Sequence, residues 1–245
     1  MAAGEVLIGM GVTLCDPAVC ELIAEAGYDF SWIDMEHASI GLDTAKQMVM
    51  AHRGTEAAPF IRVQWNDVNV IKPILDLAPA GIIVPQVNSA EQAEAAVRAC
   101  RYPPQGVRGY GPVRRTGYGA IPQQEYLEQM ADEPIIAIQI EHRDAVANLD
   151  AMLEVPGIDI FCLGLNDLSG SMGKLGLIDD PEVVEAVEAV AGKVSASDRV
   201  LGISTFYSPE TYARWMELGV RWLNLNVDFA NLYRAGRDVI EAVRG

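Results

Sequence analysis

The chain has 245 residues, of which 50% are hydrophobic, and its formal net charge is -16 at pH 7. The length is close to the roughly 250 residues of one (β/α)₈ barrel, and the composition is globular rather than disordered. A surface this acidic repels nucleic acid and anionic membranes, and no apolar run is long enough to span a bilayer, so we expect neither partner.

Two features of the sequence predict a cytoplasmic protein. Residues 1–10 carry neither a basic start nor a long apolar core, so no secretory signal is expected. The cysteines form no CxxC pair or zinc-ligand pattern, and we expect buried free thiols in a reducing compartment at Cys15, Cys20, Cys100 and Cys162.

Short apolar runs alternate with segments of helical spacing along the whole chain. The predicted strands are Val6–Gly11, Phe30–Asp34, Pro59–Val63, Gly81–Val87, Ile135–Glu141, Ile158–Gly164, Val200–Thr205 and Trp222–Asp228. The predicted helices are Ala18–Ala26, Thr44–His52, Val68–Leu77, Ala90–Cys100, Ala145–Leu153, Pro181–Val194, Pro209–Leu218 and Ala230–Val243. Near-continuous apolar strands are typical of a parallel sheet buried on both faces. Eight of them favour a closed (β/α)₈ TIM barrel, with a doubly wound open sheet as the alternative, and without any linker we expect one catalytic domain over residues 1–245.

One segment interrupts the alternation. Residues 101–122 are rich in Gly, Pro, Arg and Tyr, and three arginines gather there in an otherwise acidic chain, Arg108, Arg114 and Arg115. Long irregular connections in a compact domain are usually functional or lie at an interface, which we favour over an ordinary surface loop.

Catalytic groups of such barrels lie at the carboxyl ends of the strands. The second run ends in Asp34, Glu36 and His37, which can form a proton-handling group, and the alternative is a turn in which Asp34 caps backbone N–H groups. The third run ends in Arg62, whose planar guanidinium suits a carboxylate or an enolate oxygen, and the alternative is a structural ion pair.

Two later strand ends predict a metal site. Gln139 and Glu141 are two positions apart in an apolar strand, so they point to the same side, and a carboxylate inside a barrel is costly unless it is paired or binds a metal. Asp167 follows the next strand, where the alternative is a helix N-cap. Glu141 and Asp167 could together bind one Mg²⁺ or Mn²⁺ with a chelating 2-oxo acid.

Two absences narrow the chemistry. The only lysines are Lys46, Lys72, Lys174 and Lys193, and all fall in predicted helices or loops, so no Schiff-base lysine is expected inside the barrel. The last two strand ends lack a Gly-rich phosphate cradle, so a carboxylate substrate is favoured over a phosphorylated one.

Several blocks in order resemble the HpcH/HpaI aldolase and citrate lyase family, particularly class II pyruvate aldolases of the 4-hydroxy-2-oxoheptanedioate type. From about Gly9 to about Tyr233 the matching blocks are AGYDFSWIDMEHA, PFIRV, ILDLAPAGIIVPQV, SAEQAEAAV, RYPPQGVRG, IQIE and NLDAMLEVPGIDIFCLGLNDLSGSMG. The resemblance implies a barrel of the phosphoenolpyruvate/pyruvate type and a metal-dependent lyase that assembles as a homo-trimer or homo-hexamer. The implied metal is Mg²⁺ or Mn²⁺, with Co²⁺ as a third candidate.

The resemblance also implies residue roles. His37 would be the proton acceptor beside Asp34, and Asp76 would raise its basicity, across a subunit interface in the assembled protein. Arg62 would stabilise a pyruvate enolate and bind substrate, and Glu141 and Asp167 would be the metal ligands. The remaining substrate-binding positions would be Gln139, Gly164, Leu165, Asn166 and Asp167.

The implied reaction is reversible cleavage of a 4-hydroxy-2-oxo acid to pyruvate and an aldehyde through a metal-bound enolate. Two alternatives remain open. One is a synthase, similar to macrophomate synthase or a citrate synthase, that makes the same enolate from oxaloacetate and adds it to another acceptor. The other is a non-catalytic barrel that binds a small acid. The chain departs from the family pattern at Ala78-Pro79 and at Gly164-Leu165-Asn166-Asp167, which bears on the second substrate.

Overall fold

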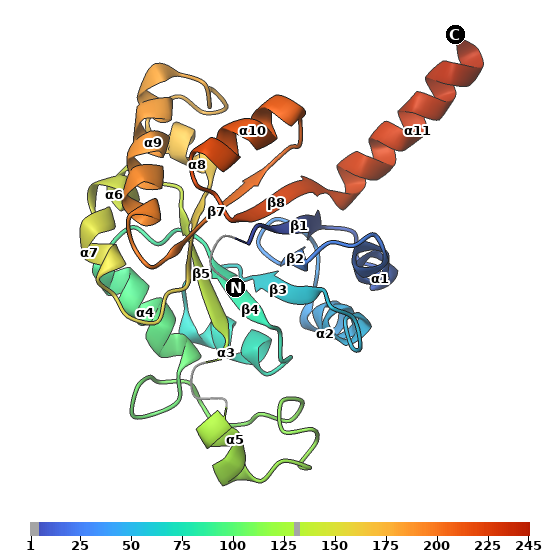
Figure 1. Ribbon diagram of the computed structural model, residues 1–245. Helices are drawn as coiled ribbons and strands as arrows, with labels where there is room; N and C mark the ends of the chain where they lie inside the picture. The colour runs from blue at the N-terminus through green and yellow to red at the C-terminus, as the bar shows by residue number, and fades with distance from the viewer. Residues whose placement is uncertain (1–4, 130–132) are drawn as a thin grey trace.

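A computed structural model describes residues 5–129 and 133–245 as a closed barrel of eight parallel strands (Figure 1). Each strand pairs with the next, and β8 pairs back with β1, so the TIM barrel prediction is confirmed and the open sheet is wrong. The strands are β1 Leu7–Val12, β2 Phe30–Asp34, β3 Ala58–Arg62, β4 Gly81–Val84, β5 Ile135–Ile140, β6 Ile160–Leu163, β7 Val200–Thr205 and β8 Trp222–Val227.

Most helices cover the outside of the barrel, and the set differs from the predictions at three places. The helices are α1 Ala18–Glu25, α2 Leu42–Ala51, α3 Val68–Leu75, α4 Ala90–Cys100, α5 Gln123–Gln129, α6 Arg143–Ala147, α7 Leu149–Leu153, α8 Leu165–Ser171, α9 Pro181–Ser195, α10 Pro209–Glu217 and α11 Asp228–Arg244. The predicted helix Ala145–Leu153 is two short helices that meet at Asn148, and α5 and α8 were not predicted.

The side chains of the strands belong to two hydrophobic cores, one between the strands and the helices and one inside the barrel. Ile136, Ile138 and Ile140 of β5 face outward and pack beneath the helices, while Ala137 between them faces the barrel interior. The same alternation then turns Gln139 inward, because successive side chains of a strand point to opposite faces. The position of each polar strand-end residue is therefore fixed by the apolar residues that precede it.

Aromatic rings fill the amino-terminal half of the barrel interior. Phe30 and Trp222 stack with their ring centroids 4.4 Å apart, and Phe60 packs against both rings. Gly9 and Gly81 leave room for these rings, since a Cβ would stand 2.2 Å from Phe30 at the first glycine and 2.3 Å from Phe60 at the second. Polar side chains are therefore confined to the carboxyl half, above this aromatic layer.

The segment after α4 leaves the barrel and carries α5 away from it (Figure 1). Arg108 in this segment is buried, donates to Asp76 at 2.9 Å and lies 4.7 Å from the ring of Tyr102. One arginine of the cluster, Arg108, thus attaches the segment after α4 to the end of α3.

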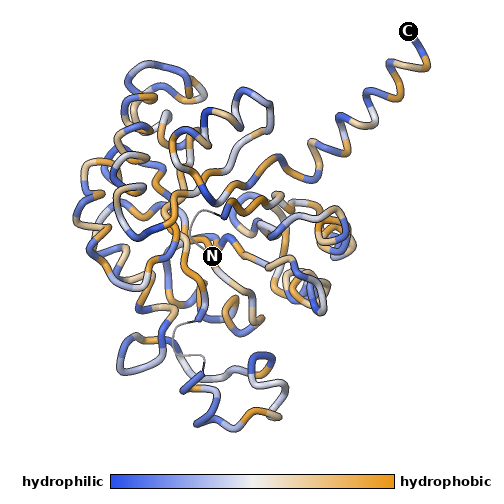
Figure 2. Tube along the Cα trace, in the orientation of Figure 1, coloured by the Kyte–Doolittle hydropathy of each residue, from blue (hydrophilic) through white to orange (hydrophobic). Residues whose placement is uncertain are grey.

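The last helix, α11, extends into solvent instead of lying along the barrel (Figure 1). Apolar and polar residues alternate along it (Figure 2), and its only buried residue is Asp228 at its first turn. Asp228 anchors the helix by accepting hydrogen bonds from the backbone N–H groups of Thr13 and Leu14, at 2.9 and 2.8 Å.

Among residues 5–129 and 133–245, no helix is long and apolar enough to cross a bilayer.

The four cysteines are free thiols, and three of them are buried as predicted, namely Cys20, Cys100 and Cys162. Cys15 is exposed, because it lies in the turn after β1 rather than in a strand.

Candidate active site

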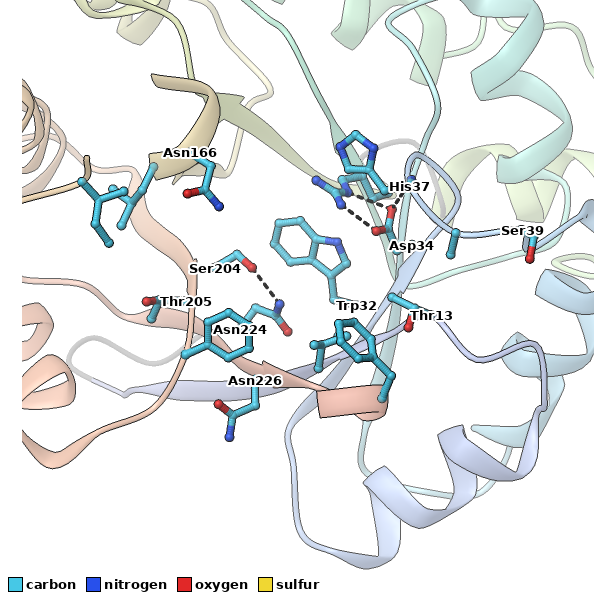
Figure 3. A pocket seen from close by; sticks show the side chains of 18 residues that line it. Thr13, Trp32, Asp34, His37, Ser39, Asn166, Ser204, Thr205, Asn224 and Asn226 are labelled. Carbon is cyan, nitrogen blue, oxygen red and sulfur yellow. Dashed lines mark hydrogen bonds and ion pairs between the residues drawn. The ribbon is translucent and has the colours of Figure 1, made fainter. Parts of the chain in front are cut away.

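A cavity of about 800 Å³ opens at the carboxyl ends of the strands (Figure 3). Its wall is charged on the side of β2 and β3, where Asp34, His37 and Arg62 line it. The opposite wall, from β7 and β8, presents the neutral side chains of Ser204 and Asn224. The cavity therefore has one polar, charged side and one polar, uncharged side.

Arg62 is held rigidly on the charged side. Its Nε and Nη2 donate to the two oxygens of Asp34 at 3.0 and 2.6 Å, and its Nη1 donates to Oε1 of Gln139 at 3.4 Å. The guanidinium carbon also lies 5.4 Å from the ring centre of Trp32. Burial lowers the pKa of Arg62, but hydrogen bonding and charge from Asp34 and then Glu36 more than offset this and leave it above its ordinary value. The ion pair predicted as an alternative role for Arg62 is therefore present, and it positions the guanidinium in the cavity.

Asp34 also organises the turn that follows β2. Its Oδ1 accepts from the backbone N–H groups of Glu36 and His37 at 3.0 and 3.2 Å, as the capping alternative predicts. The His37 ring does not contact Asp34 but lies with Nε2 3.8 Å from Oε2 of Glu36, and its side chain is 66% exposed. His37 is therefore free to reach a substrate held in the cavity.

Gln139 and Glu141 lie together inside the barrel, as the two-residue spacing predicts. Gln139 Nε2 donates to Oε2 of Glu141 at 2.9 Å, and the backbone N–H of Gln86 donates to Oε1 of Glu141 at 2.7 Å. Burial raises the pKa of Glu141 to about 7, against the lowering effect of the Gln86 hydrogen bond, and the negative charges of Glu36 and Asp167 raise it further. Burial likewise raises the pKa of Glu36.

The donor set of this carboxylate group fits a hard divalent cation. Glu36 Oε2 is buried with no aligned hydrogen bond, although Arg62 Nη1 lies 3.0 Å away. Within the part of the chain that the structure describes, no cluster of three or more His, Cys, Asp or Glu side chains is arranged as a complete metal site. Two carboxylates with water and substrate oxygens are the ligands that Mg²⁺ usually takes, so Glu141 and Asp167 suit such an ion.

The β6–α8 turn brings Asp167 and Asn166 to the same end of the barrel. Helix α8 begins at Leu165 after Gly164, so Asp167 lies inside its first turn and is not the N-cap that the alternative proposed. A Cβ at Gly164 would stand 2.6 Å from Oε2 of Glu141, so glycine is required for the carboxylate to lie there. Leu165 and Asn166 line the cavity, whereas Glu141 and Asp167 are not among its lining residues, and Glu141 is connected to it through Gln139 and Arg62.

Asp76 does not meet His37 within one chain. It ends α3 and is paired with Arg108 at 2.9 Å. Any contact with a histidine base would have to come from a neighbouring subunit, which leaves the cross-subunit role as a prediction.

The neutral wall was missed by the sequence predictions. Ser204 and Asn224 face the interior because Ile203 of β7 and Leu223 and Leu225 of β8 face the outer core. Asn224 Nδ2 donates to Oγ of Ser204 at 2.9 Å, a pair visible in Figure 3. The strand alternation could have found these two residues, but neither carries a charge that draws attention.

Comparison with known proteins identifies the family. The family model described as HpcH/HpaI aldolase/citrate lyase matches residues 7–229. The chain is 36% identical to a hydroxypyruvate/pyruvate aldolase of Pseudomonas aeruginosa, over 100% of this chain and 91% of the relative. It is also 36% identical to a 4-hydroxy-2-oxo-heptane-1,7-dioate aldolase of Escherichia coli, over 96% and 89% of the two chains.

A solved structure agrees with this relationship. The crystal structure of an HpcH/HpaI aldolase from Desulfitobacterium hafniense DCB-2 superposes with a TM-score of 0.92 at 29% identity, covering 99% of this chain and 94% of the other. The barrel fold and these matches together show that the chain is a carbon–carbon lyase that belongs to the HpcH/HpaI aldolase/citrate lyase family.

Proposed function

We propose that the chain catalyses the reversible retro-aldol cleavage of a 4-hydroxy-2-oxo acid to pyruvate and an aldehyde. The observation that carries the proposal is the placement of Arg62, which Asp34 clamps through two nitrogens while Gln139 links it to Glu141. The guanidinium of Arg62 is a positive charge near the carboxylates of Glu141 and Asp167. This arrangement suits a substrate whose oxygen becomes negatively charged next to a bound metal.

The chain's own residues divide the chemistry between them. The guanidinium of Arg62 has five N–H groups, and those that remain after its contacts with Asp34, Gln139 and Glu36 are available to the oxygen of the pyruvate enolate. As the carbon–carbon bond breaks, His37 takes the proton of the aldol hydroxyl, directly or through water, and a proton is then passed to C3 of the enolate to give pyruvate. In the synthetic direction it removes the C3 proton and gives a proton to the new hydroxyl group. The backbone of Gly164, Leu165, Asn166 and Asp167, with Gln139, positions the substrate.

The family supports a divalent metal cofactor. We propose Mg²⁺ or Mn²⁺, with Co²⁺ as a third candidate, held by Glu141 and Asp167. Such an ion supplies positive charge that polarises the keto group of the 2-oxo acid. We further propose that residues 1–245 act as one catalytic domain in the cytoplasm, with neither nucleic acid nor membrane as a partner.

Hydrogen exchange at pyruvate tests the proposal without knowledge of the aldehyde. In D₂O with protein and Mg²⁺ or Mn²⁺, we expect the methyl signal of pyruvate in proton NMR to fade faster than with metal and buffer alone. Chelator should stop the exchange. His37→Ala should slow it, because the histidine, directly or through water, moves the C3 proton, whereas Arg53→Ala, on an exposed turn, should not.

The alternatives predict different results in the same assay. Decarboxylation of oxaloacetate without pyruvate exchange would indicate the synthase, because loss of CO₂ needs no base at C3. Tight binding of pyruvate and metal without either reaction would indicate the non-catalytic barrel.

We also propose that the protein is a homo-oligomer, as a trimer or hexamer. Exposed apolar residues of α11 recur at helical spacing and form one stripe, which consists of Phe229, Leu232, Tyr233, Val239, Ile240 and Val243. A stripe of this kind is normally covered by protein, and a second copy of the chain carries an identical stripe that can pack against it.

Light scattering measures the assembly directly. The double variant Leu232→Glu/Val239→Glu places two charges on side chains that are 68% and 62% exposed, so we expect the wild-type oligomer to dissociate to the 26.5 kDa monomer. Arg234→Glu, on the opposite side of α11, is the matched control and should leave the assembly intact. A stable, fully active wild-type monomer would contradict the oligomer and remove the cross-subunit role of Asp76.

A further inference from the structure

The neutral wall of the cavity holds a polar group that no part of the described chain satisfies. Asn224 is 5% exposed and lines the cavity, its Nδ2 is used by Ser204, and its Oδ1 is buried without a hydrogen-bond partner. A buried acceptor of this kind is normally satisfied by protein, water or ligand. The unpaired oxygen therefore calls for a donor from whatever occupies this side of the cavity.

Ser204 adds a second hydrogen-bonding group beside it. Because its Oγ accepts from Asn224, its own O–H is left to donate. The pair thus offers one acceptor and one donor at neighbouring positions. A neutral hydroxyl group satisfies the acceptor, whereas a hydrocarbon or an ionised carboxylate has no proton to give.

The distribution of charge around the cavity points the same way. Among the described residues that line it, the ionisable groups are Asp34, His37 and Arg62, and all three lie on the charged side. Arg62 is already paired with Asp34. A carboxylate that extended along the neutral wall would meet no cation, and an unpaired buried charge is costly.

The two sides of the cavity match the two halves of an aldol. The charged side, with Arg62 and the nearby Glu141, is where the proposed function places pyruvate. The aldehyde attacked by C3 of the enolate must then approach from the remaining side, where Ser204 and Asn224 lie across the cavity (Figure 3).

We propose that Asn224 and Ser204 select the aldehyde, and that this substrate is a short, uncharged hydroxyaldehyde whose hydroxyl donates to Asn224 Oδ1. In the cleavage direction the substrate is then a 2-oxo acid with hydroxyl groups at C4 and beyond, and without a second carboxylate. This inference rests on the proposed function and names the substrate class of the same site.

Three aldehydes added to pyruvate and Mg²⁺ test the selectivity. Glycolaldehyde carries the hydroxyl, propanal has a methyl group in its place, and succinic semialdehyde carries a carboxylate. For the wild type we expect kcat/KM for glycolaldehyde to exceed that for propanal by about tenfold or more, as for one hydrogen bond to a buried group, and succinic semialdehyde to be poorest. Equal values for the first two, or a preference for succinic semialdehyde, would overturn the proposal.

Variants locate the selectivity at Asn224. Asn224→Leu keeps the volume and removes the acceptor, so the ratio of glycolaldehyde to propanal should fall to about one through loss of glycolaldehyde turnover, while Asn224→Asp, which keeps an acceptor, should retain part of the ratio. Asn69→Leu on the exposed side of α3 is the matched control. An unchanged glycolaldehyde-to-propanal ratio in Asn224→Leu would contradict the assignment. If that variant does not fold, the wild-type series and the same ratio measured in Ser204→Ala still test whether this wall selects the aldehyde.

Pyruvate exchange separates this inference from the function on which it rests. Wild-type protein that exchanges the methyl protons but shows no preference among the aldehydes overturns only the hydroxyaldehyde. Wild-type protein that neither exchanges pyruvate nor joins it to any aldehyde overturns the proposed function.

Discussion

Replacing Glu141 with Ala is expected to abolish metal-dependent turnover, with a loss of roughly a thousandfold in kcat/KM, since a bound cation contributes several kcal/mol of charge stabilisation. Glu141 is 2% exposed and lies in the same carboxylate group as Asp167 and Glu36. Asp167→Ala should have the same effect for the same reason. Steady-state kinetics after chelation and Mg²⁺ titration, with metal binding by calorimetry, measure both losses.

The choice of variants separates metal binding from folding. Glu141→Ala leaves Gln139 and the backbone N–H of Gln86 without their acceptor, which costs about 1–3 kcal/mol for a buried group. Glu141→Gln keeps an acceptor oxygen and the volume, so it should fold normally and still bind metal poorly. Glu188→Ala, on the exposed face of α9, controls for removal of a carboxylate elsewhere. Full activity of Glu141→Ala after chelation and return of Mg²⁺ would show that the ligand assignment is wrong.

Arg62→Lys is expected to lower kcat by about a hundredfold, the usual cost of losing one preorganised donor to a developing oxyanion. Lysine keeps the positive charge but not the planar fork, so it cannot bond both oxygens of Asp34 and also reach Gln139 and a substrate oxygen. The affinity for metal should change much less than kcat, because Arg62 is not a ligand.

Single-turnover and steady-state rates at saturating metal test this role. Arg53→Lys makes the same chemical change on an exposed turn and should keep the wild-type kcat. An unchanged kcat in Arg62→Lys would remove the arginine from the enolate oxygen and leave it only as the partner of Asp34.

Local patterns in the sequence were enough to predict the barrel and the charged side of the cavity. Apolar runs at regular spacing predicted eight strands, and the alternation within β5 predicted that Gln139 and Glu141 share a face, which their 2.9 Å hydrogen bond confirms. Helix ends were less certain. Asn148 interrupts the predicted helix Ala145–Leu153, and its side chain donates to the carbonyl of Asn88, a partner 60 positions away.

The pattern within each strand was enough to predict the charged groups at the strand ends, because side-chain direction along a strand depends only on local backbone geometry. Which of these groups contact one another depends on how the whole barrel packs. Closure of β8 onto β1 places Asn224 and Ser204 across the cavity from Arg62. In the segment that follows α4, Arg108 forms an ion pair with Asp76, which therefore does not pair with His37. Such partners lie tens of positions apart in the chain, and packing of the whole barrel brings them together, so no local pattern could have predicted them.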